Sequence, residues 1–153
     1  MALGVGSMQN NTTGISNTAV GTVSLCANTT GIQNTALGLA ASRLNTGGTN
    51  NVSVGFYALR NNTVGNNNVA VGVLALQDNT ASSNTAVGFC ALRSNTTGIN
   101  NTSVGLCSLA LNTTGTYNTA VGTNALFSNT TGGCNTAVGT YALRANTTGI
   151  RNT

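Results

Sequence analysis

The chain repeats one 17-residue unit along its whole length. Three successive copies start at Asn101, Asn118 and Asn135 and read NTSVGLCSLALNTTGTY, NTAVGTNALFSNTTGGC and NTAVGTYALRANTTGIR. A short fixed period restricts the fold to repeat architectures, in which each unit packs on its neighbours along one axis. We number each unit from its first Asn, as positions 1 to 17.

The units form one uninterrupted array over residues 1–153, which predicts a single repeat domain with no linker and no second domain. One unit, residues 68–83, has 16 residues and lacks the loop glycine. Solenoids usually carry atypical terminal caps, so we expect a fragment of a longer array or a subunit whose ends are covered. Full units begin at Asn17, Asn34, Asn51, Asn68, Asn84, Asn101, Asn118 and Asn135, and partial units occupy 1–16 and 152–153.

The composition favours an ordered β structure over disorder or helix. The only charged side chains are five arginines and Asp78, and there is no His, Lys, Pro or Trp. A disordered chain of this polarity is usually rich in Pro, Glu and Lys, whereas Val and Leu recur here at fixed positions. Two glycines per unit and only about four good helix formers in succession disfavour a helix.

Each unit predicts two short strands and two turns. Positions 2 to 6 read as a strand with positions 2, 4 and 6 on one face, and positions 7 to 10 read as a second strand. The NTTG sequence at positions 12 to 15 is typical of a turn, in which we expect glycine to permit a positive φ. The expected fold is an all-β parallel β-solenoid or β-roll of about nine coils, spaced about 4.8 Å apart in a rod roughly 43 Å long.

Three rows of residues are assigned roles from their recurrence. The predicted core rows are positions 4 and 9, and position 12 predicts a ladder of stacked, hydrogen-bonded Asn side chains. The core residues are Val20, Leu25, Val54, Leu59, Val71, Leu76, Val87, Leu92, Val104, Leu109, Val121, Leu126, Val138 and Leu143. The ladder residues are Asn28, Asn45, Asn62, Asn79, Asn95, Asn112, Asn129 and Asn146, and position 1 predicts a second Asn ladder.

A third apolar row at position 6 predicts self-association. Its members are Leu39, Phe56, Val73, Phe89 and Leu106. Two apolar rows make a thin core for an isolated rod, and the small residues at positions 3, 5 and 8 permit close approach of backbones. We therefore expect a homo-oligomer, with the trimer as the favoured state and position 6 at the interface.

The NTAVG segment followed by ALxxNTTG resembles the repeats of phage and virus tail-fibre proteins, and the whole chain takes part in this resemblance. It is also similar to the head repeats of trimeric autotransporter adhesins, whose core is a short SVAIG-like strand. The resemblance implies a left-handed parallel β-roll, with three rolls sharing a central core and Ala19-Val20-Gly21 and its copies as the inner strand. The unit differs from the shorter adhesin repeat in its length of 17 residues.

The side chains offer little chemistry for catalysis or metal binding. With no His or Lys and one carboxylate, no general acid–base pair can be assembled, so we expect no enzyme and no cofactor. Cys26, Cys90, Cys107 and Cys134 lack the spacing of a metal site. Cys90 and Cys107 share position 7 of adjacent units, where the coil spacing is slightly long for a disulfide, and we expect free thiols there.

The remaining polar residues are interpreted as surface features. Asp78 is expected to be a turn residue beside the shortened loop. Four arginines (Arg43, Arg60, Arg93 and Arg144) share position 10, and Arg151 is at position 17. Such a stripe can attract anionic glycans or nucleic acid, but its wide spacing favours a role in solubility, with no nucleic-acid partner. The NTT sequons, as at Asn95, are explained by turn chemistry with or without a glycan.

Together these features predict a non-enzymatic structural segment of an extracellular or virion-surface fibre, whose expected partners are other copies of the chain and a host glycan or receptor. No apolar run is long enough to insert into a membrane. Two alternatives remain open. One is a solenoid subunit that stacks end to end into filaments through exposed strand edges. The other is an ice-binding solenoid. The sequence argues against it, because the position-2 Thr row is expected to alternate with core residues.

Overall fold

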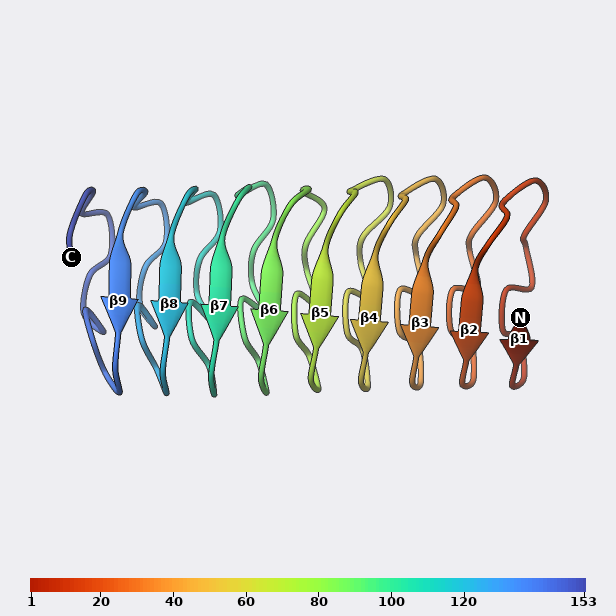
Figure 1. Ribbon diagram of the computed structural model, residues 1–153, viewed down its shortest axis with the longest axis horizontal. Coiled ribbons are helices and arrows are strands. Elements are labelled where there is room, and N and C mark those ends of the chain that lie inside the picture. The colour runs from red at the N-terminus through yellow and green to blue at the C-terminus, as the bar shows by residue number, and fades with distance from the viewer.

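A computed structural model describes all residues, 1–153, as one parallel β-solenoid (Figure 1). Nine strands pair in chain order in a single sheet, and the two termini lie at opposite ends of the rod. This confirms the all-β solenoid fold. The strands are β1 (Ala2–Leu3), β2 (Thr18–Val20), β3 (Thr35–Leu37), β4 (Val52–Val54), β5 (Val69–Val71), β6 (Thr85–Val87), β7 (Thr102–Val104), β8 (Thr119–Val121) and β9 (Thr136–Val138).

Each coil contains one strand and not the two that were expected. The strand covers positions 2 to 4 and pairs in register, as Val87 does with Val104. Positions 7 to 10 are turns, because residues at positions 7 and 9 take a left-handed backbone, with φ of 54° at Cys90 and 51° at Leu92. The prediction of a second strand at positions 7 to 10 is therefore wrong.

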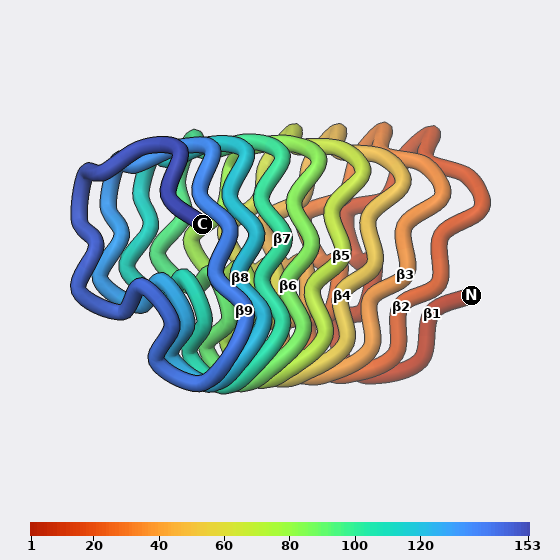
Figure 2. The backbone as a smooth tube through the Cα atoms, turned by 60° about the vertical axis from the view of Figure 1, so that its left-hand side comes forward, coloured from red at the N-terminus to blue at the C-terminus, as the bar shows by residue number.

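Three overlapping reverse turns replace that second strand. In the coil that begins at Asn84, the amide of Ala91 donates to the carbonyl of Gly88, that of Arg93 to Cys90, and that of Asn95 to Leu92, at 3.3 Å in each case. Alternate amides still bond to the next coil, since the Leu92 amide donates to the Ser108 carbonyl at 2.9 Å. The coils consequently stack with nearly the same outline along the whole rod (Figure 2).

The core consists of the residues at positions 3, 8 and 9. Leucines at position 9 are fully buried, and they pack against buried Ala or Ser at positions 3 and 8. The prediction of a core row at position 9 is confirmed. Leu143 packs against the core from the last coil, and the other predicted leucines have no exposed surface: Leu25, Leu59, Leu76, Leu92, Leu109 and Leu126.

The expected core row at position 4 faces outward, so that part of the core assignment is wrong. A three-residue strand turns only its central residue toward one side, and that residue is the Ala or Ser at position 3. The small position-3 side chain leaves room inside a narrow coil for one leucine from position 9. The outward residues are Val20, Val54, Val71, Val87, Val104, Val121 and Val138, of which Val138 is 69% exposed.

One polar substitution divides the core. Ser42 occupies position 9 where other coils have Leu, and its hydroxyl donates to the hydroxyl of Ser53 in the next coil at 2.8 Å. Both side chains are buried. The apolar core is accordingly split into a short cluster around Leu25 and a long cluster that begins at Ala58.

The position-12 asparagines form a buried ladder inside the turn that closes each coil. Asn95 donates from Nδ2 to Oδ1 of Asn79 at 2.7 Å and to the carbonyl of Gly98 at 2.8 Å, and its own Oδ1 accepts from Asn112 at 2.8 Å. The ladder residues from Asn28 to Asn129 are buried. Each side chain thus bonds a backbone carbonyl within its own turn and a ladder residue of a neighbouring coil. The ladder is interrupted between Asn62 and Asn79, at the shortened coil, where Oδ1 of Asn62 has no partner.

The position-1 asparagines form a second ladder on the other side of this turn. Asn101 donates from its backbone amide to Oδ1 of Asn84 at 3.0 Å and from Nδ2 to the carbonyl of Gly115 at 2.9 Å. These bonds satisfy buried polar groups that no β ladder reaches. Between positions 12 and 1, these side-chain amides add to backbone bonds between coils, such as the bond of 2.9 Å from the Thr96 amide to the Thr113 carbonyl.

Glycine is required at position 15 because a side chain would not fit there, and not because of the backbone conformation. Its φ is not positive in any coil, contrary to expectation. A Cβ built on Gly98 would instead collide with Oδ1 of Asn95 and with the carbonyl of Gly115 in the next coil. In the short coil, the carbonyl of Ala81 takes the place of the glycine carbonyl and accepts from Asn68 and Asn79.

We predict that Asn95→Ser destabilises the rod while Asn100→Ser does not. Asn95 is buried and loses three hydrogen bonds, which should lower the free energy of unfolding by about 2–4 kcal/mol. Asn100 is exposed at position 17, where Ser already occurs in other coils, so its change should stay within about 0.5 kcal/mol. Urea unfolding followed by circular dichroism measures both, and equal losses would contradict the ladder's role.

Candidate interaction surface

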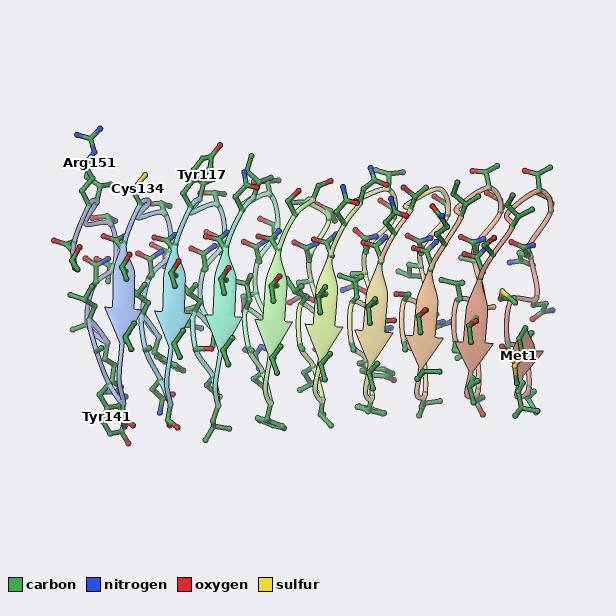
Figure 3. The ribbon with its side chains drawn as sticks, viewed as in Figure 1. Met1, Tyr117, Cys134, Tyr141 and Arg151 are labelled. Carbon is green, nitrogen blue, oxygen red and sulfur yellow. The ribbon has the colours of Figure 1, made fainter.

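The rod has no pocket, so the candidate site is a surface of the solenoid. The broad face of the sheet carries the side chains of positions 2 and 4, which stand outward from each strand (Figure 3). Position 2 is Thr in most coils and Val in two, and position 4 is Val or Leu. This face is uncharged along its entire length.

Large apolar side chains at position 6 extend this face into an apolar band. The predicted interface residues all lie on the surface, with exposed fractions between 39% and 49%. Position 6 is separated from position 4 only by the glycine at position 5. We define the apolar band as Leu37, Leu39, Val54, Phe56, Val71, Val73, Val87, Phe89, Val104 and Leu106, which span five consecutive coils.

The position-5 glycines set the direction in which the band leaves the sheet. Gly105 has a φ of 132°, a conformation that side chains other than glycine rarely adopt. A Cβ on Gly105 would also lie 2.6 Å from the carbonyl oxygen of Gly122 in the next coil. Glycine therefore lets the chain turn sharply after the strand while neighbouring coils keep their spacing, and this presents position 6 at the edge of the face.

The arginine row lies beside position 7, where aromatic rings hold some of its members. The Arg60 guanidinium stands 4.8 Å from the centre of the Tyr57 ring, which itself stacks on Phe56 at 3.9 Å. Arg144 lies 5.6 Å from the ring of Tyr141 and 5.7 Å from that of Phe127. Such cation–π contacts fix the guanidinium groups against the rod instead of leaving them extended into solvent.

Asp78 sits at position 11 beside the shortened loop. Its Oδ1 accepts a hydrogen bond from Nδ2 of Asn61 in the preceding coil, at 2.9 Å. The contact is one more polar link between two coils, of the same kind as the Asn ladders.

The four cysteines are free thiols at three different sites on the rod. Cys134 is exposed at the edge of the rod opposite Tyr141 (Figure 3). Cys90 and Cys107 are neighbours in adjacent coils, and burial raises the pKa of the Cys90 thiol, with a further increase from Cys107 and a partial decrease from the nearby Arg93 guanidinium.

The arrangement of Thr and Val on the sheet corrects the argument against an ice-binding face. The position-2 Thr was expected to alternate with the core, yet it shares the outward face with position 4, as Thr119 does with Val121. The constant Ala or Ser at position 3 was the sequence signal for this arrangement, because only a small residue fits inside so narrow a coil.

Comparison with known protein families, curated proteins and solved structures finds no match to this chain. The chain also forms no helix with the length and hydrophobicity needed to cross a membrane.

We predict that Gly105→Ala is more destabilising than Gly139→Ala. Both glycines have a positive φ, 132° at Gly105 and 122° at Gly139. Gly139 lies in the last complete coil, so a Cβ there would meet nothing within 4 Å. Gly139→Ala should therefore add only backbone strain, about 1–3 kcal/mol, whereas Gly105→Ala adds a collision with the next coil. Urea midpoints at an unchanged m-value measure the difference, and equal losses would show that φ alone requires glycine.

Proposed function

We propose that this chain is a non-enzymatic structural segment of an extracellular or virion-surface fibre, in which copies of the rod associate through the apolar band. The observation that carries the proposal is an uncharged row of large apolar side chains on the surface, continuous over five consecutive coils. Contiguous apolar patches of this kind mark interaction sites in soluble proteins.

A second copy of the same chain is the partner that fits this band. Its rows repeat once per coil, about every 4.8 Å, so a partner must present groups with the same rise to meet every row. A parallel copy in register has that rise by construction. Positions 2, 4 and 6 carry no charge, and the arginines lie at positions 10 and 17, so copies can approach without repulsion across the band.

Closed rings of three place the band of each chain toward a common axis. Self-association about such an axis buries the same surface on every copy and leaves the arginine row accessible to solvent. The mechanism is mechanical: paired coils and buried Asn ladders give length and stiffness, while a binding tip carried elsewhere would contact a host glycan or receptor.

We predict a species of three chains in solution, dissociated by Phe56→Asp with Phe89→Asp. The two changes put charges into the centre of the apolar band, where burial without a partner is unfavourable. Light scattering after gel filtration measures the mass. A monomeric wild-type chain would contradict the shared interface.

A matched control uses the same two coils and the same added charges away from the band. Val64 and Thr97 are exposed at position 14 of the coils that carry Phe56 and Phe89. Val64→Asp with Thr97→Asp should leave the mass at three chains. Circular dichroism checks that both double variants keep the solenoid.

The location is tested separately by immunogold labelling of intact particles or cells, where an absence of surface label would contradict a surface fibre.

An ice-binding surface is the second candidate, and the shared outward face of positions 2 and 4 is the observation that favours it. The hydroxyls of the position-2 threonines, such as that of Thr102 in β7, form no hydrogen bond within the chain. A flat sheet with coils about 4.8 Å apart presents these hydroxyls and the valine methyl groups as a regular array toward water. The bulky Phe56 and Phe89 beside this array favour protein association instead.

Thermal hysteresis separates these two candidates. A trimer that buries position 4 should show no freezing-point depression beyond the colligative value. The dissociated Phe56→Asp, Phe89→Asp variant exposes the face and serves as the internal comparison. A clear hysteresis gap in the wild-type protein, abolished by Thr102→Lys, would replace the fibre proposal with ice binding.

A further inference from the structure

Cys90 and Cys107 occupy equivalent places in two successive coils. Both lie at position 7, where φ is 54° and 50°, and their strands pair in register three residues earlier. The Cys107 amide donates to the carbonyl of Phe89 at 2.9 Å, which fixes the two cysteine backbones one coil apart. The intervening distance between equivalent atoms is therefore about 4.8 Å.

The two thiols interact with each other and form an isolated pair. Burial raises the pKa of the Cys90 thiol, and the neighbouring Cys107 thiol adds to this increase. The flanking residues of the row are Leu74 and Asn124, so no third thiol is adjacent. The other two cysteines lie elsewhere, Cys26 at position 10 and Cys134 at the opposite edge of the rod.

We propose that Cys90 and Cys107 are a modification site, which closes to a reversible disulfide between neighbouring coils when a small-molecule disulfide such as oxidised glutathione is present. The cross-link joins two residues of one chain and does not require association between copies. It forms in the folded rod, whose reduced state has free thiols.

The order of reaction follows from exposure. Cys107 is half-buried while Cys90 is 5% exposed, so the Cys107 thiolate reaches the reagent first. It attacks one sulfur of the small disulfide, and one small thiolate leaves. The Cys90 thiolate then attacks the Cys107 sulfur of the mixed disulfide and expels the second small thiolate. Two thiols of the protein are oxidised and one disulfide of the reagent is reduced, with both protons released to solvent or to the leaving thiolates.

Arg93 assists the second step. The turn from Cys90 to Arg93, closed by an amide-to-carbonyl bond of 3.3 Å, keeps this residue on the same side of the coil. Its guanidinium opposes the effect of burial on the Cys90 pKa and so favours the attacking thiolate.

Coil spacing allows the bond but leaves it under tension. A separation of about 4.8 Å lies inside the Cα range of disulfides, about 4.4–6.8 Å, yet slightly beyond the Cβ range of about 3.5–4.5 Å. Closing the bond requires the two coils to approach locally by a few tenths of an ångström. A strained disulfide is more easily reduced than a relaxed structural one, so the cross-link should open again in a mild excess of reduced glutathione.

The test uses the full chain with Cys26→Ser and Cys134→Ser, treated with oxidised glutathione under native conditions. Intact-mass spectrometry should show the loss of two hydrogens, and peptide mapping should link Cys90 to Cys107. The urea midpoint should rise, because the bond closes a loop in the unfolded chain. A persistent glutathione adduct on Cys107, or two thiols still free after prolonged treatment, would overturn the proposal.

A matched control moves the second thiol one coil further along the same row. Cys107→Ser with Asn124→Cys, in the same background, keeps two thiols at position 7 but separates them by two coils, about 9.6 Å. Asn124 has the same backbone conformation, with φ of 54°. This variant should give only mixed disulfides with glutathione. An equal yield of intramolecular disulfide would show that chain mobility, and not the coil register, brings the thiols together.

Discussion

The structure depends on hydrogen bonds that run along the rod from each coil to the next. In the strands these are backbone bonds of a parallel sheet, but the sheet covers only three residues of each unit. Outside the strands backbone amides also bond from coil to coil, and the amide side chains of positions 1 and 12 add a second set of links, with each Asn bonded both to its counterpart and to a backbone carbonyl. Because buried amides are costly when unpaired, every coil constrains the identity of the same residue in its neighbours.

This constraint explains why so little of the coil interior is apolar. Two rows of Asn fill one end of the cross-section, and one row of Leu with two rows of Ala or Ser fills the other. The polar end tolerates no extra atom, since the position-15 glycine packs directly against Asn Oδ1. The apolar end accepts a polar replacement only where a partner is present, as Ser42 finds in Ser53.

Large apolar side chains are consequently displaced to the outside. A narrow coil that holds one leucine per turn has no room for the Val of position 4 or the Phe of position 6. They form an uncharged band on one side, and Arg60 is held beside this band by the Tyr57 ring, which stacks on Phe56. The same exclusion from the interior that keeps the rod thin thus creates the surface on which we propose that copies associate.

The sequence by itself determined the solenoid architecture, the length of the coil, the buried leucine row and the asparagine ladders. A period of 17 residues with Asn and Leu at fixed positions leaves few other ways to satisfy amides and bury apolar groups in a stack. Only the tertiary structure decided which residues of the strand face inward and that positions 7 to 10 form turns and not a second strand. Either Val20 or Ala19 could point into the core from the strand, and the width of the coil decides which of the two does. That width is set by the left-handed residues at positions 7 and 9, such as Cys90 and Leu92, whose unusual backbone is stabilised by bonds to neighbouring coils and has no signature in residue type.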